Sequence, residues 1–186
     1  MVGKLVAVLL AFNASVGAAQ QKATELTAGV IGLSHTSCDG CDGILIASTG
    51  GAENGVFSGL GGGTIGVGFY LSPRLSIEPT ISFSRLSTGG ESLTIFGVGA
   101  AVPFYFAKGW GRKGPYLAPR GTYNSFSGDG GSATQFTAGA AIGTKVPLND
   151  MAALRLQASF DYGIESSDVN STTAFGGLIG LSVFLR

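Results

Sequence analysis

The chain has 186 residues and no formal net charge, and charged residues make up only 12% of it, about half the usual share in a soluble protein. A neutral chain gives no reason to expect nucleic acid as a partner. Mean hydropathy is positive, yet beyond the N-terminal segment no apolar stretch approaches the roughly 20 residues that a spanning helix needs. This combination favours a transmembrane β-barrel, whose alternating strands never form long apolar runs.

Residues 1–19 are predicted to be a cleavable signal peptide. Lys4 supplies a positive charge, residues 5–12 form a short apolar segment, and small residues follow up to a cleavage site after Ala18 or Ala19. A membrane anchor is disfavoured because the apolar run is too short to span a bilayer. Residues 20–186 are therefore expected to form the exported barrel domain.

Two cysteines follow the first predicted strand, residues 24–34. Cys38 and Cys41 have the spacing C-x-x-C within a long loop segment. The compartment reached by export is oxidising, so a small disulfide within the loop is the favoured interpretation. A redox motif would need a thioredoxin-like context, and a metal site would need more than the nearby His35 and Asp39. We therefore predict no metal site and no cofactor.

Strict alternation of apolar and polar residues marks the strands. In residues 74–85, one face is apolar and the other carries serine, threonine and Glu78. Each alternating segment is long enough to cross a bilayer as a tilted strand. The sequence predicts eight strands, at residues 24–34, 57–71, 74–86, 92–106, 114–125, 134–148, 151–164 and 173–185.

The predicted connections differ between the two ends of the strands, and the aromatic residues gather at both ends. Short turns fall at one end of the strands, and longer polar segments fall at the other, as in outer-membrane barrels with their long loops outside the cell. Aromatic residues fall near both ends, whereas the strand middles are small. We interpret the aromatic residues as two girdles at the membrane interfaces. The girdle near the turns includes Phe69, Tyr70, Phe104, Tyr105, Tyr116 and Phe184.

A soluble barrel with an internal ligand is the alternative architecture. Its polar face would meet water and would need many charges. Here the polar faces hold mostly Ser, Thr and Gly, and the apolar faces carry no charge. A charge on a lipid-facing surface would cost up to about 2–4 kcal/mol. We therefore expect an all-β, antiparallel up-and-down transmembrane barrel in the cell outer membrane, with lipid against its apolar face.

The chain resembles the eight-stranded outer-membrane β-barrel proteins, the porin-family group that includes OmpA-type domains and opacity-type surface proteins. The resemblance covers the whole exported chain and rests on GVGFYLSPRLSIEPTISFSR (66–85), GPYLAPRGTYN (114–124) and LRLQASFDYG (154–163). It implies folding by the outer-membrane assembly machinery. Family members usually end on an aromatic residue, whereas this chain ends LSVFLR, with Arg186 last. The barrel is expected to be monomeric.

Charged residues on the predicted inward face are Glu78, Arg120, Lys145, Arg155 and Asp161. Glu78, Arg120 and Arg155 are expected at similar depth. Buried charges need partners, and an eight-stranded barrel has little free space inside. We therefore predict an ion-pair network that plugs the interior, with a polar path for small solutes as the alternative.

Three functions stay open at this point. A structural or adhesin-like role, with a host or other extracellular ligand at the loops, is favoured because exposed loops on a rigid scaffold often carry binding. A narrow pore for small solutes is the second. A lipid-modifying enzyme is the third, and it would need a base beside a nucleophile at the lipid rim. His35 is the single histidine and lies in a predicted loop, so we predict no enzymatic activity.

Overall fold

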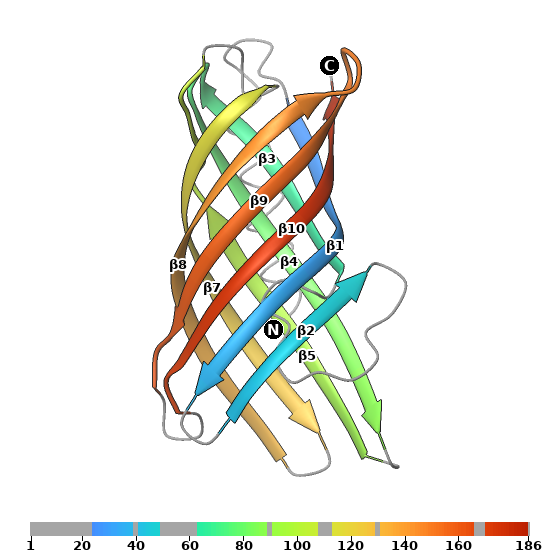
Figure 1. The fold of residues 1–186 in the computed structure, drawn as a ribbon, viewed down its shortest axis with the longest axis vertical. Helices are drawn as coiled ribbons and strands as arrows, with labels where there is room; N and C mark the ends of the chain where they lie inside the picture. The colour runs from blue at the N-terminus through green and yellow to red at the C-terminus, as the bar shows by residue number, and fades with distance from the viewer. Residues whose placement is uncertain are drawn as a thin grey trace, which may run out of the picture.

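The computed structural model describes residues 24–38, 41–48, 63–88, 91–107, 113–128, 131–165 and 170–185. These residues form a closed antiparallel barrel without helices (Figure 1), which confirms the predicted fold class. The predicted signal peptide, residues 1–19, lies outside the described residues. No helix long and apolar enough to cross a membrane occurs in the described part of the chain.

Eight strands make up the wall. Each pairs antiparallel with its neighbour, and β10 pairs with β1 to close the ring. The short strand β6 (Phe104–Tyr105) continues the wall between β4 and β7. In spatial order the eight are β1 (Thr24–Cys38), β3 (Gly63–Ser72), β4 (Leu75–Thr88), β5 (Glu91–Ala101), β7 (Gly114–Gly128), β8 (Gly131–Pro147), β9 (Ala152–Gly163) and β10 (Thr172–Leu185).

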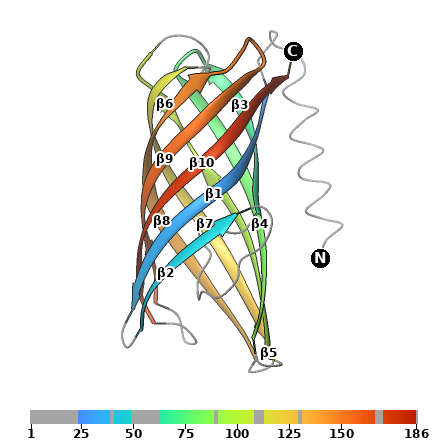
Figure 2. The same cartoon turned by 45° about the vertical axis from the view of Figure 1, so that its right-hand side comes forward.

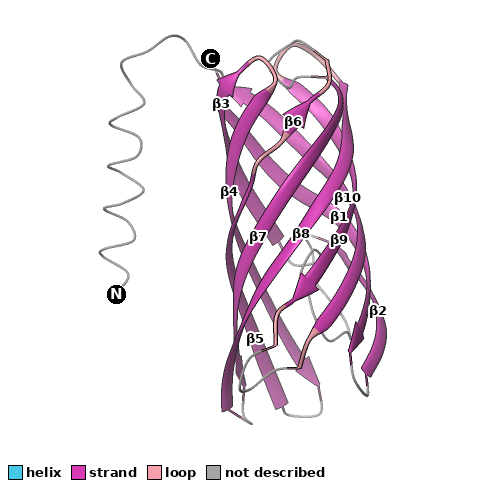
Figure 3. Cartoon of the chain, turned by 90° about the vertical axis from the view of Figure 1, so that its left-hand side faces the viewer, coloured by secondary structure: helices cyan, strands magenta, loops and turns pink. Residues whose placement is uncertain are grey.

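Two rims bound the barrel. The turn rim carries the β3–β4 and β8–β9 connections and the strand ends Thr24 and Leu185, and it lies at the top of Figures 1 and 3. The loop rim carries the hairpins that join β1 to β2, β4 to β5, and β7 to β8. The strands run between the rims at a strong tilt (Figure 2). Both ends of the described chain therefore lie at the same rim.

The first hairpin differs from the prediction. The sequence predicts a loop over residues 34–56, but β1 continues to Cys38 and the chain returns through β2 (Cys41–Ser48). Strand β2 pairs with the loopward half of β1, Ile31–Cys38, whereas β3 pairs with Thr24–Ala28. The predicted end of the strand was wrong because a polar, glycine-containing hairpin can continue a backbone ladder without a strict alternation of apolar and polar residues.

Two other loop-rim connections, β4–β5 and β7–β8, are shorter than the sequence predicts. We expected loops over residues 87–91 and 126–133, but β4 and β5 pair as far as Thr88 and Glu91, and β7 and β8 pair as far as Gly128 and Gly131. The predicted strand 92–106 is instead interrupted between β5 and β6, at Val102 and Pro103. Proline has no N–H for the ladder, although the Pro103 carbonyl still accepts a hydrogen bond from the Ser76 amide at 3.1 Å.

The wall has an apolar outward face and a largely polar inward face. On β8, for example, Ile142 and Val146 are exposed, whereas Gln135 and Lys145 are buried. A continuous exposed apolar surface of this kind marks contact with a membrane or a partner. Exposed apolar side chains surround the barrel and include Ile65, Ile81, Phe83, Tyr123, Phe136, Ile142, Phe160, Tyr162, Phe175 and Ile179.

One matched pair of variants can test whether a charge on the outward face costs more within the wall than at the turn rim. Ile142 and Leu148 are 60% and 58% exposed, and Leu148 lies just past the end of β8 at the turn rim. Ile142→Arg should destabilise the barrel in lipid vesicles by about 2–4 kcal/mol, whereas Leu148→Arg should cost about 0–1 kcal/mol. Urea unfolding in vesicles measures both, and equal small costs would show that lipid does not contact this face.

Candidate functional site

A cluster that we call the seal fills the barrel near the turn rim. Lys145 Nζ lies 2.6 Å from both carboxylate oxygens of Glu25 and donates to the hydroxyls of Tyr70 at 3.2 Å and Tyr105 at 3.0 Å. It also lies 4.9 Å from the centroid of the Tyr105 ring, within the range of a cation–π contact. The seal comprises Glu25, Tyr70, Tyr105, Tyr116, Lys145 and Phe184, which are all almost completely buried.

Glu78 and Arg155 form a second ion pair directly loopward of the seal. Arg155 Nη1 lies 2.5 Å from Glu78 Oε1, and the Thr27 hydroxyl donates to the same oxygen at 2.8 Å. Arg155 Nε donates to the Tyr116 hydroxyl, and Nη2 donates to Gln157 Oε1, both at 2.8 Å. The guanidinium therefore has a partner at each of its three nitrogens, as a buried charge requires.

A third pair joins Arg120 on β7 to Asp161 on β9. Arg120 Nε donates to Asp161 Oδ1 at 2.7 Å, and a terminal nitrogen pairs with the other carboxylate oxygen, which gives the bidentate geometry. Nearer the loop rim, Gln135 donates to the backbone oxygen of Asn170 at 3.1 Å and accepts from the Thr172 hydroxyl at 3.4 Å. Polar contacts thus extend along the barrel axis.

Glycines in the wall make these contacts possible. Arg120 and Asp161 lie two strands apart, and Gly139 is the residue paired with both of them on the intervening strand β8. A Cβ at Gly139 would overlap the Asp161 carboxylate and the Phe160 backbone oxygen. Gly143 separates Tyr116 from Gln157 in the same way. Each contact therefore reaches past one strand over a residue that has no side chain.

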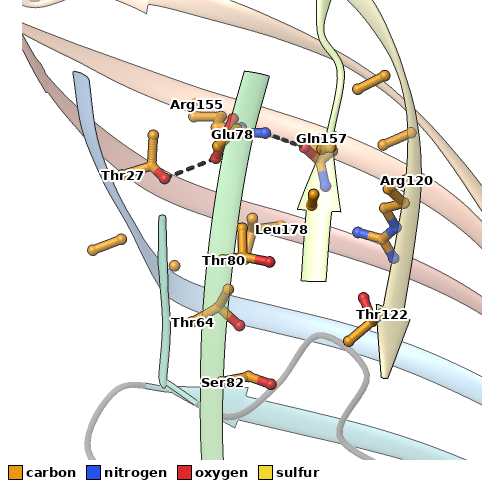
Figure 4. Close-up of a pocket in the computed structure, with 16 residues that line it drawn as sticks. Thr27, Thr64, Glu78, Thr80, Ser82, Arg120, Thr122, Arg155, Gln157 and Leu178 are labelled. Carbon is orange, nitrogen blue, oxygen red and sulfur yellow. Dashed lines mark hydrogen bonds and ion pairs between the residues drawn. The ribbon is translucent and has the colours of Figure 1, made fainter. Parts of the chain in front are cut away.

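A cavity of about 70 Å³ lies beside the Glu78–Arg155 and Arg120–Asp161 pairs (Figure 4). A space of this size accommodates a few water molecules, since one water needs roughly 10–15 Å³ of such volume. Its lining combines alanines and Leu178 with hydroxyl groups, which come from Thr27, Thr64, Thr80, Ser82 and Thr122. The arrangement supports ordered water and small ions rather than a substrate of drug size.

The structure pairs the predicted interior charges differently from the prediction. Glu78 meets Arg155, but Arg120 pairs with Asp161 instead of joining them. The partner of Lys145 is Glu25, which the sequence analysis missed. The sequence did indicate that Glu25 points inward, because in the first predicted strand it stands next to the apolar Leu26, which occupies the outward face.

Four aromatic residues assigned to the turn-side girdle point into the barrel. Tyr70, Tyr105, Tyr116 and Phe184 are at most 3% exposed and belong to the seal. The outward aromatics at this rim are instead Phe104 and Phe106, which are exposed, and the partly exposed Phe69. The girdle assignment was wrong for the first four because proximity to the strand end says nothing of which face a residue occupies.

Cys38 and Cys41 are paired residues of the β1–β2 ladder, at the end of the first hairpin. Their side chains lie outside the described residues, so the predicted disulfide stays a prediction. His35 lies within β1 rather than in a loop, opposite Phe175 of β10, and its side chain is exposed. Asp39, considered beside it as a metal ligand, is outside the described residues.

Comparison with known proteins identifies the architecture. No protein-family model matches the chain, and no curated protein matches its sequence. Neisserial surface protein A matches with a TM-score of 0.63 at 14% identity, over 88% of this chain and 97% of that one. The chain has the fold of the eight-stranded outer-membrane β-barrels.

Two further barrels of this fold match over nearly their whole length. OprG from Pseudomonas aeruginosa matches with a TM-score of 0.53 at 10% identity, and the match spans 89% of this chain and 96% of the OprG chain. Ail, the attachment invasion locus protein of Yersinia pestis, matches with a TM-score of 0.51 at 11% identity, and the match spans 89% of this chain and 100% of the Ail chain. Identities this low establish the fold and not the activity.

The glycine contacts give a second test. Gly139→Ala should destabilise the barrel by about 1–3 kcal/mol, because its methyl group overlaps fixed backbone and the Asp161 carboxylate. Gly177→Ala is the matched control, since its nearest atom is the Gln157 backbone oxygen at 3.9 Å, and it should change stability by no more than about 0.5 kcal/mol. Urea unfolding measures both. Equal stability of the two variants would contradict the close approach at Gly139.

Proposed function

We propose that this chain is an integral outer-membrane protein whose barrel is surrounded by lipid and presents the loop rim to the outside of the cell. The exposed apolar surface around the wall supports contact with lipid. The fold shared with OprG and Ail supports the outer membrane as the location. The barrel serves a structural or surface-interaction role, and its interior is closed by its own side chains.

The seal is the observation that carries the closed interior. Three tyrosines, one phenylalanine and the Glu25–Lys145 pair occupy the barrel near the turn rim, and each of these side chains is at most 3% exposed. An eight-stranded barrel is just wide enough for side chains to fill. Separating Glu25 from Lys145 would leave both charges buried without their ion-pair partner, which is unfavourable, so the seal does not open readily by losing that contact.

Conductance in a planar bilayer tests the closed interior. The wild-type barrel should show no steady channel, because the seal blocks the axis. Tyr105→Ala should raise the conductance, since Tyr105 is buried within the seal, whereas Phe104→Ala should leave it unchanged, because this neighbouring side chain is 47% exposed on the outward face. A large, steady channel in the wild type would overturn the proposal in favour of a pore.

The charges near the loop rim indicate which ligands the surface would accept. The sequence of the loop-rim connections contains Asp39, Asp42, Asp129, Glu165 and Asp168, and Glu91 begins β5; of these side chains the structure describes that of Glu165, which is exposed. Among the lysine and arginine residues, Arg85 lies nearest in the sequence to any of these acidic residues, shortly before Glu91. Ail is known in complex with a heparin analogue, sucrose octasulfate. A polyanion of that kind is repelled by an acidic rim, so we propose a ligand with positive charge.

Retention on charged surfaces tests this choice of ligand. The purified barrel should pass through immobilised heparin and should bind immobilised polylysine at low salt, with release as salt screens the attraction. Glu165→Gln removes an exposed loop-rim charge and should weaken retention, whereas Asp150→Asn, at the exposed turn rim, serves as the control. Retention on heparin by the wild type would contradict an acidic binding surface.

A further inference from the structure

The charges of the connections have opposite signs at the two rims. Acidic residues predominate in the sequence of the loop-rim connections. At the turn rim, the sequence of the β3–β4, β6–β7 and β8–β9 connections contains one acidic residue, Asp150, and four basic residues, Arg74, Lys108, Arg112 and Lys113. Of these side chains the structure describes those of Arg74, Lys113 and Asp150, and all three are exposed. The turn rim is therefore the end of the barrel that attracts an anion.

Arg74 and Lys113 lie on the two sides of β6, which Figure 3 shows close to the turn rim. The Arg74 carbonyl accepts a hydrogen bond from the Tyr105 amide at 2.8 Å, which fixes Arg74 beside β6. On the other side, the Phe106 amide donates to the Pro115 carbonyl at 3.1 Å, and Lys113 comes two positions before that proline. No ion pair among the described residues involves Arg74 or Lys113, so both charged groups are available to an anion.

The outward face between these two basic residues is apolar. Phe104 and Phe106 are both exposed. Phe104 pairs with Leu75 of β4 and with exposed Leu117 of β7, so the apolar face continues across three strands. Basic groups beside exposed aromatic and aliphatic side chains match a phospholipid at the membrane interface, where the headgroup adjoins the acyl chains. We call this surface the rim patch, and it comprises Arg74, Phe104, Phe106, Lys113 and Leu117.

We propose that the rim patch binds anionic phospholipids of the leaflet that meets the turn rim, with the headgroup phosphate at Arg74 and Lys113 and the acyl chains against Phe104 and Phe106. Arginine binds phosphate through two parallel hydrogen bonds, and lysine binds it as a point charge. This inference rests on the lipid contact proposed above and adds a selectivity to it, since lipid contact alone does not distinguish headgroups. The acidic loop rim repels the same headgroups, so the barrel selects anionic lipid at one end only.

Tryptophan fluorescence with brominated lipids tests this selectivity, because bromine on an acyl chain quenches a tryptophan that the lipid contacts. The experiment uses the full exported chain with Trp110→Phe, which removes the single tryptophan. Phe104→Trp then places a reporter in the rim patch, and Phe136→Trp places one on the outward face towards the loop rim. Both native side chains are 47% exposed, so the two positions are matched.

The vesicles contain phosphatidylglycerol, which is anionic, and phosphatidylcholine, which is neutral overall, and either lipid carries the bromine. Both leaflets have the same composition, so the orientation of the barrel does not affect the comparison. Each variant is first checked for heat-modifiable gel mobility, so that only folded barrels are compared. The ratio of quenching by the two brominated lipids gives the preference at each reporter.

At position 104, phosphatidylglycerol should bind about fivefold more strongly than phosphatidylcholine, as expected for a basic residue near an anionic surface. Position 136 should show no such preference. Salt should weaken the preference at position 104, and Arg74→Gln with Lys113→Gln should abolish it. Arg74→Lys with Lys113→Arg keeps both charges and should retain it. Asp150→Asn removes a charge of opposite sign from the same rim and should not reduce it.

Inorganic phosphate distinguishes a phospholipid site from a site for the free ion. At equal ionic strength, phosphate should reduce the preference at position 104 no more than chloride does, because the free ion has no acyl chains to contact Phe104 and Phe106. Stronger competition by phosphate than by chloride would overturn the assignment of a phospholipid to the rim patch.

The contrary outcomes separate this inference from the proposed function. Equal preferences at positions 104 and 136, or a preference that survives the double glutamine substitution, would overturn the rim patch and leave lipid contact intact. Absence of quenching at both positions would show that lipid does not contact the outward face, and it would overturn both proposals.

Discussion

The pairing of β10 with β1 is the constraint on which the rest of the structure depends. This ladder runs from Thr24 and Leu185 to Cys38 and Thr172, so the first and last strands hydrogen-bond along their length. In lipid, each unpaired backbone group would cost several kcal/mol, and only closure removes the edges. A closed wall has one outward face and one face towards the interior. The charges of the strands are therefore directed inward, into a space that admits little besides side chains.

The narrow interior then determines the composition of the wall. A charged side chain reaches its partner across the barrel or past an intervening strand, and the intervening residue must be small. Gly139 and Gly143 fill that position on β8, between partners on β7 and β9. The high glycine content of the chain, 32 residues, is thus in part a packing requirement of the polar interior. In most strands glycine is a weakness, but here it lets ion pairs form.

Much of this architecture could be predicted from the sequence, because alternation reports directly which residues face outward and which face inward. The inward positions of Glu78, Arg155 and Asp161 follow from it. Their partners do not, because pairing across the barrel depends on strand tilt and register, which period-two patterns leave open. Tyr105 shows the same limit, since an aromatic residue near a rim suits either face. Strand β2 and the interruption at Pro103 lie where backbone geometry, not lipid, determines the ladder.

The Glu25–Lys145 contact joins residues 120 positions apart in the chain. Neither charge has this partner until β1 and β8 are both in place. An incomplete chain would expose both an open strand edge and unpaired charges, and neither is stable in hydrocarbon. The Glu25–Lys145 contact thus makes a partly assembled barrel unfavourable, which favours complete assembly.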